Sequence, residues 1–167
     1  MDAMITGPLQ LHFLRHGLAD RSAYTGTDDR LRPLTPEGTA RMRAEAATMA
    51  RLGLGYDLIL TSPLTRCRQT ADIAAEALGL SGLVEEDARL APGFDLEDLG
   101  AMLADHPGED VIMLVGHEPD FSWVVSGLTG GSDIVFKKGG LARVDLVPGD
   151  RLVGDLVWLV PPKILAL

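Results

Sequence analysis

The sequence predicts an α/β fold: a three-layer α/β/α sandwich with a mixed, mostly parallel central sheet. Three short apolar runs, at 9–14, 57–61 and 111–115, have the length and composition of buried strands. Segments that fit helices separate them, and this alternation is typical of parallel strands joined by crossover helices. Near the end of the chain, apolar and polar residues alternate instead, which predicts an antiparallel hairpin.

Two helices in the first half have clear start signals. Thr35-Pro36-Glu37 combines an N-cap residue, a proline at the first helical position and an acid in the first turn, so a helix is expected from there to about Leu52. Ser62-Pro63 repeats the cap and the proline and opens a second helix, which Gly79 ends. The apolar face of this second helix consists of Cys67, Ala71, Ala74 and Leu78.

The other segments follow the same logic. The polar stretch 20–33 has no clear period, and a loop of this length is typical of a functional or mobile segment. The elements expected after it, besides those already named, are a strand in 83–90, a helix over 95–104, a helix over 120–128, and hairpin strands 142–146 and 152–159 around a turn at 147–150.

Composition limits the class of protein. The length of 167 residues suits a single domain, taken as residues 1–167. With 46% hydrophobic and 23% charged residues, the chain is neither disordered, nor a collagen, nor a coiled coil. The 24 acidic and 15 basic residues give a net charge of −9, so neither nucleic acid nor an anionic membrane is expected as a partner. A site for an anion must therefore be a local basic pocket.

The single cysteine, Cys67, fits a reducing compartment and cannot form an internal disulfide. The start of the chain, Met1-Asp2-Ala3-Met4, has an acid where a signal peptide carries positive charge. No apolar run approaches the ~18 residues that cross a membrane. We therefore expect a cytoplasmic protein.

The chemistry-bearing residues follow the three apolar runs directly. Arg15-His16-Gly17 follows the first, Ser62-Pro63-Leu64-Thr65-Arg66 the second, and Gly116-His117 the third. Ligands of open α/β sheets bind at the carboxyl ends of the strands, so Arg15, His16, Arg66 and His117 are expected to meet in one crevice. Guanidinium groups, imidazoles and helix N-termini together suit a phosphate-like dianion.

Other chemistries lack their signatures. The sequence has no His-Glu-x-x-His metal motif, no G-x-S-x-G serine elbow and no G-x-x-x-x-G-K-[ST] phosphate loop, so neither a metal nor a cofactor is predicted. His12 is interpreted as a strand residue that faces the sheet or solvent. Cys67 is interpreted as a core residue of its helix.

These motifs resemble the histidine phosphatase superfamily, which includes the phosphoglycerate mutases, and in particular its small SixA-type phosphohistidine phosphatases. The resemblance runs from about residue 9 to about residue 159. The segments that carry it are Leu14-Arg15-His16-Gly17, Arg32-Pro33-Leu34-Thr35-Pro36-Glu37-Gly38, Ser62 to Ala71, Val115-Gly116-His117-Glu118-Pro119 and Lys138-Gly139-Gly140-Leu141-Ala142.

The resemblance implies a phosphoglycerate mutase-like fold and a metal-independent phosphatase. In the family mechanism His16 is the nucleophile that forms a phosphohistidine intermediate. Arg15, Arg66 and His117 clamp the oxygens of the transferred group. Gly17 and Ser62 are expected to contact the substrate, with an N-cap role as the alternative for Ser62.

One feature of the larger superfamily members has no match here, namely the glutamate that protonates an alkoxide leaving group. The candidate general acids are Asp20, Glu85, Glu86, Asp95, Glu97 and Glu118. A missing acid favours a phosphoramidate substrate, because imidazole leaves more readily than an alkoxide. The leading hypothesis is therefore a phosphatase of protein phosphohistidine, for example on a histidine phosphotransfer domain, that releases inorganic phosphate. The alternatives are a small-molecule phosphomonoesterase and a non-catalytic phosphate-binding module.

Overall fold

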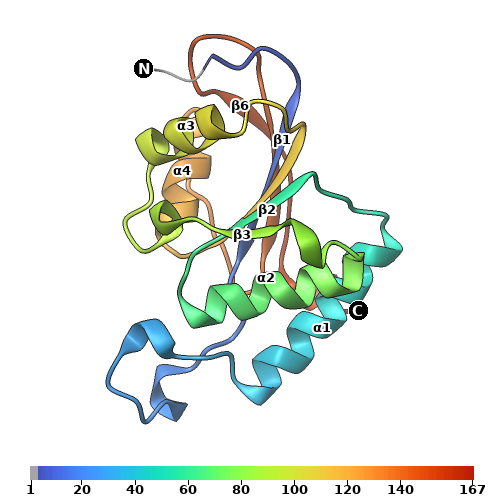
Figure 1. Ribbon diagram of the computed structural model, residues 1–167, viewed down its shortest axis with the longest axis vertical. Helices are drawn as coiled ribbons and strands as arrows, with labels where there is room; N and C mark the ends of the chain where they lie inside the picture. Colours follow the sequence, from blue (N-terminus) through green and yellow to red (C-terminus); the bar gives the residue numbers. More distant parts are fainter. Residues whose placement is uncertain (1–3) are drawn as a thin grey trace.

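The computed structural model describes residues 4–167 and has one six-stranded sheet between two layers of helices (Figure 1). The strands are β1 (Leu9–Arg15), β2 (Leu58–Thr61), β3 (Val84–Glu86), β4 (Val111–Gly116), β5 (Leu141–Leu146) and β6 (Gly154–Val160). The helices are α1 (Pro36–Arg51), α2 (Thr65–Leu78), α3 (Leu96–Asp105), α4 (Asp120–Leu128) and α5 (Pro162–Leu165). Helices α1 and α2 cover one face of the sheet and α3 and α4 cover the other, which confirms the predicted three-layer α/β/α fold.

The strand order is β3-β2-β4-β1-β5-β6. The first four strands are parallel, and β5 and β6 are antiparallel to their neighbours. The predicted mixed, mostly parallel sheet is therefore confirmed. Because β2, β4 and β1 are adjacent, the three segments that follow them leave the sheet side by side at one edge.

Two apolar clusters hold the layers together. Along β1, Leu11 and Phe13 pack against the α3 and α4 layer, while Leu14 packs against α1 and α2. This alternation follows from the period of two in a strand, and both faces are apolar because helices cover both. Cys67 and Ala71 of α2 are fully buried in the second cluster, as expected from the apolar face of that helix.

Several boundaries differ from the expected ones. Helix α2 begins at Thr65 rather than directly after Ser62-Pro63. The strand expected in 83–90 is confined to β3, because Asp87 accepts a hydrogen bond from the N–H of Arg89 at 2.9 Å and so caps a 3-10 turn. The short helix α5, which packs on α1, was not predicted, since four residues carry no usable period.

The polar stretch 20–33 projects beyond the end of β1 (Figure 1) and forms two 3-10 turns, Arg21–Ala23 and Asp29–Leu31. Asp29 binds both Arg21 and Arg32 through ion pairs of 2.8 Å. The loop is thus tied together by its own charges instead of by an apolar core.

His12 lies in β1, as predicted for a strand residue. It does not face solvent, because its side chain is buried beside Tyr56, whose hydroxyl lies 2.9 Å from Nδ1 of His12. The two rings meet edge to face, with Trp158 on a second side of the imidazole.

Candidate active site

The structure brings the predicted histidines together at the carboxyl ends of β1 and β4. The ring centroids of His16 and His117 are 5.4 Å apart. The N–H of His16 also donates to the carbonyl of Gly116 at 3.1 Å, so the first residue beyond β1 continues the pairing with β4. The parallel register of these strands therefore sets the relative position of the two imidazoles.

His16 has the protonation state that a nucleophile needs. Its ring is buried, and Nδ1 donates to the carbonyl of Gly17 at 2.8 Å, since a carbonyl can only accept. Burial, followed by the positive surroundings of His117, Arg66 and Arg15, lowers the pKa of His16 to about 3. The imidazole is therefore neutral at neutral pH, with its lone pair on Nε2.

A glycine turn fixes the backbone of His16. The N–H of Gly139 donates to the carbonyls of both Arg15 and His16 at 3.1 Å, and the N–H of Arg15 donates to the carbonyl of Gly140 at 3.1 Å. Gly139 has φ +83°, a conformation that side chains other than glycine rarely adopt. The late glycine motif thus supports the segment that carries His16.

The segment before β5 holds the side chain of Arg15. Its Nη1 donates to the carbonyl of Phe136 at 2.6 Å, while Nε is buried and has no hydrogen-bond partner within residues 4–167. Burial lowers the pKa of Arg15, and the nearby carboxylate of Glu118 opposes this effect. An unpaired buried guanidinium N–H is a donor suited to an anionic oxygen.

Arg66 lies in the first turn of α2, and the loop 20–33 orients it. Its Nη1 donates to the carbonyl of Asp29 at 3.0 Å and lies 3.4 Å from the Asp29 carboxylate. Its Nε, like that of Arg15, is buried without a partner in the described part of the chain. Burial and the neighbouring Arg32 lower the pKa of Arg66. Both arginines therefore have a free donor in the same site.

Ser62 contacts His117. Its hydroxyl lies 2.8 Å from Nε2 of the imidazole, and Sγ of Cys67 lies 3.4 Å from the same nitrogen. The N-cap alternative for Ser62 is wrong, because the N-cap of α2 is Leu64, which has no side-chain cap. Burial, followed by Arg66 and Arg15, lowers the pKa of His117 to about 4.

The comparisons with known proteins agree with this geometry. Residues 11–92 match the family model of the histidine phosphatase superfamily (branch 1). An uncharacterised protein of Picosynechococcus sp. is 37% identical over 92% of this chain and all of its own length. The phosphohistidine phosphatase SixA of Escherichia coli is 28% identical over 92% of this chain and 94% of its own. A solved structure of the protein histidine phosphatase SixA complexed with tungstate has a TM-score of 0.83 and 26% identity, and covers 94% of this chain and 99% of that one.

The chain belongs to the histidine phosphatase superfamily. Together with the SixA-like neighbours, this membership supports phosphatase activity.

Three site residues of this histidine phosphatase were not singled out from the sequence. Arg32 is close enough to Arg66 and His117 to lower the pKa of both, and Asp29 supplies the opposing charge. Thr70 accepts a hydrogen bond from the N–H of Gly17 at 3.1 Å. The signal for Arg32 was present in the Arg32-Pro33-Leu34 motif, but only the folded loop shows which way it turns.

Gly17 packs tightly in this arrangement. Its N–H is used by Thr70, and a Cβ there would lie 3.2 Å from the side chain of Leu34. The absent side chain therefore makes room for Leu34, and a substrate contact through Gly17 stays a prediction.

The six candidate acids have different surroundings. Asp20 and Asp95 cap a 3-10 turn and α3, Glu85 and Glu97 are exposed, and Glu86 pairs with Arg68 at 3.4 Å. Glu118 lies beside Arg15, and its carboxylate accepts hydrogen bonds from the N–H and the hydroxyl of Ser122. Of the six candidates, Glu118 is therefore the one that acts on Arg15 through its charge.

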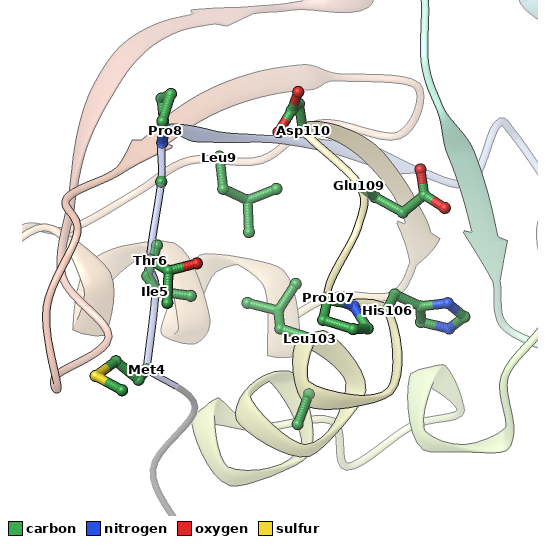
Figure 2. Close-up of a pocket in the computed structure, with 12 residues that line it drawn as sticks. Met4, Ile5, Thr6, Pro8, Leu9, Leu103, His106, Pro107, Glu109 and Asp110 are labelled. Atoms are coloured by element: carbon green, nitrogen blue, oxygen red, sulfur yellow. The ribbon is translucent and has the colours of Figure 1, made fainter.

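A cavity of about 490 Å³ lies at the opposite end of the parallel strands, where β1 and β4 begin (Figure 2). Pro8, Leu9 and Asp110 are among its lining residues, and it contains no predicted site residue. It is therefore separate from the histidine pair.

Within residues 4–167 there is no group of three or more His, Cys, Asp or Glu side chains placed to bind a metal ion. In the same part of the chain, no helix has the length and hydropathy to cross a membrane.

Proposed function

We propose that this protein is a metal-independent phosphatase that acts on protein phosphohistidine through a phosphohistidine intermediate on His16. The observation that carries the proposal is the neutral His16, with its lone pair on Nε2, beside the unpaired donors of Arg15 and Arg66. A nucleophile within a cluster of fixed cations suits transfer of a dianionic phosphoryl group.

The reaction has two steps. In the first, Nε2 of His16 forms a bond to phosphorus while the P–N bond of the substrate breaks, and the substrate's imidazole, protonated on its other nitrogen, leaves as the neutral ring. In the second, water attacks phosphorus, the P–Nε2 bond breaks and inorganic phosphate is released. Arg15, Arg66 and His117 position the oxygens and offset the charge in both transition states, with Ser62 orienting His117.

The surroundings of the carboxylates support a P–N substrate. Most of the candidate acids serve as caps, pair with arginine or face solvent. An imidazole leaving group does not depend on such an acid. The relative from Escherichia coli is named a phosphohistidine phosphatase, and tungstate, bound in the similar SixA structure, is a tetrahedral oxyanion like phosphate.

A small-molecule phosphomonoesterase is the second candidate, and Glu118 favours it. A carboxylic acid beside Arg15 could protonate an alkoxide as it leaves. If this is the activity, Glu118→Gln lowers ester hydrolysis strongly, whereas hydrolysis of a phosphoramidate is little changed.

The deciding experiment is steady-state hydrolysis in EDTA. The substrates are a phosphorylated histidine phosphotransfer domain, phosphoramidate and a panel of phosphomonoesters. We expect preference for the P–N substrates, and a ³²P-labelled enzyme after an alkaline quench that is absent in His16→Ala. Preference for an ester contradicts the proposed substrate, and normal turnover in His16→Ala contradicts the nucleophile. Phosphate binding without turnover on any substrate indicates a non-catalytic module.

A further inference from the structure

An apolar groove with an exposed tryptophan lies between the start of α3 and the first turns of α4. It has a volume of about 300 Å³ and is lined by Phe94, Asp95, Leu96, Glu97, Trp123 and Val124. Phe94 and Val124 are buried and form its floor, whereas the side chain of Trp123 is 68% exposed. A large aromatic side chain left in solvent beside a hollow is a typical anchor for a protein partner.

The groove is preformed, because the start of α3 rests on α4. A Cβ at Gly127 would lie 2.8 Å from Leu96, so the absent side chain allows this close contact. Asp120 accepts a hydrogen bond from the N–H of Gly93 at 2.8 Å, which ties the segment before α3 to the start of α4. Binding of a partner therefore requires little ordering of the residues that form the groove.

The groove is also within reach of the catalytic edge. The N–H of Phe121 donates to the carbonyl of His117, and the N–H of Trp123 donates to the carbonyl of Pro119. Trp123 thus lies in the first turn of α4, which begins directly after the segment 117–119 that follows β4. One bound protein can thus fill the groove and present a side chain to His16.

Two further exposed apolar residues flank the arginines. Leu31, 61% exposed, belongs to the turn whose Asp29 binds Arg66. Val135, 69% exposed, precedes Phe136, whose carbonyl binds Arg15. Scattered exposed apolar residues are ordinary, and these two lie on the segments that contact the arginines.

The charge of the groove indicates the chemistry of its occupant. Its six lining residues include two acids, Asp95 and Glu97, and no base. Asp98 adds a third carboxylate in the same turn of α3. An occupant with lysine or arginine beside its apolar contact complements this rim.

We propose that this groove docks a helix of the phosphorylated protein substrate, with an apolar side chain against Trp123 and basic side chains toward Asp95 and Glu97. A helix that places apolar residues in a groove is a common mode of recognition. The proposal rests on the proposed function, because a docking groove is useful only if the phosphoryl group is on a protein.

The first test compares two P–N substrates that differ in size. Trp123→Ala is expected to lower kcat/KM for a phosphorylated histidine phosphotransfer domain at least tenfold, mainly through KM, and to leave kcat/KM for phosphoramidate unchanged. Leu52→Ala removes another exposed apolar side chain, 66% exposed and at the end of α1, and is the matched control. Thermal melts confirm that both variants fold.

The second test addresses charge. Glu97→Lys is expected to lower kcat/KM for the protein substrate more than Glu97→Gln does, and 0.5 M NaCl should reduce the difference. Glu76→Lys, an exposed charge reversal on α2, is the control and should have no such effect.

A binding measurement completes the design. The protein has two tryptophans, so Trp158→Phe leaves Trp123 as the single reporter. In His16→Ala/Trp158→Phe, the fluorescence of Trp123 should shift to the blue when the phosphorylated domain is added. Equal kcat/KM for Trp123→Ala and wild type on the protein substrate overturns the groove and leaves the proposed function intact. Wild-type activity on esters alone overturns both.

Discussion

The hydroxyl of Ser62 lies 2.8 Å from Nε2 of His117, so the residue that follows β2 orients the imidazole that follows β4. Both side chains are buried. The contact links two neighbouring parallel strands at their carboxyl ends and places His117 against His16.

Ser62→Ala tests this contact. Loss of one neutral hydrogen bond of about 1 kcal/mol predicts a decrease of kcat of roughly fivefold, with little change in KM. The measurement is steady-state kinetics on phosphoramidate, together with thermal melts. Ser81→Ala, which removes an exposed hydroxyl, serves as the control. An unchanged kcat in Ser62→Ala would mean that His117 is held without it.

Arg66→Ala should lower kcat/KM by about 10²–10³-fold, because in the proposed mechanism this guanidinium offsets charge in the transition state. The fold should persist, as judged by circular dichroism. Arg66→Lys should restore little, since an ammonium cannot keep the carbonyl of Asp29 and donate through the position of Nε at once. Arg68→Ala, in the same helix but paired with Asp72 on its exposed side, is the control. Equal losses in the two alanine variants would exclude a specific role for Arg66.

The lowered pKa values of the buried histidines predict the response to acid. Burial first, and then neighbouring positive charge, gives His16 a pKa of about 3, and His12 and His117 pKa values of about 4. Unfolded, each titrates near 6.5, so the unfolded chain binds more protons between these values. Stability should therefore decrease as pH falls from about 6.5 toward 4, by a few kcal/mol.

The measurement is an NMR titration of the imidazole rings in the folded protein, with the urea-unfolded chain as reference. We expect His12, His16 and His117 to stay neutral down to pH 5. Titration of His16 near 6.5 would remove the argument that it is a neutral nucleophile.

The buried side chain of Glu45 predicts that stability depends on pH in the opposite direction. Its side chain is buried in α1 next to Gly139, Oε2 has no hydrogen-bond partner within residues 4–167, and burial raises its pKa to about 8. The folded protein therefore holds a proton that the unfolded chain releases near pH 4.5, and stability decreases as pH rises from there to about 8.

Glu45→Gln should abolish this decrease. In urea unfolding, its free energy of unfolding relative to wild type should rise by about 1–3 kcal/mol between pH 5 and pH 8.5. Glu76→Gln, at an exposed position, should show no such trend. Parallel pH profiles for Glu45→Gln and wild type would contradict a buried neutral acid.

The sequence by itself determined the layers of this protein and the strand ends at which the candidate site residues lie. Three apolar runs predicted adjacent parallel strands, and Arg15, His16, Arg66 and His117, which follow these runs, were predicted to meet. This worked because strand periodicity and the rule that parallel strands end at one edge are local and topological properties. The beginning of α2 was misplaced: its N-cap is Leu64, whose N–H donates to the hydroxyl of Ser62 at 3.3 Å. The same hydroxyl contacts His117, and no local pattern contains that long-range contact.

Only the tertiary structure decided how the cations are held and which acids lie near them. Arg66 takes its orientation from Asp29, and Arg15 from the carbonyl of Phe136, partners that lie far away along the chain. The neutral state of His16 depends on burial by several elements at once, and the groove beside Trp123 exists because the start of α3 packs on α4. These features depend on distances through space, which sequence spacing does not encode once the chain has turned between elements.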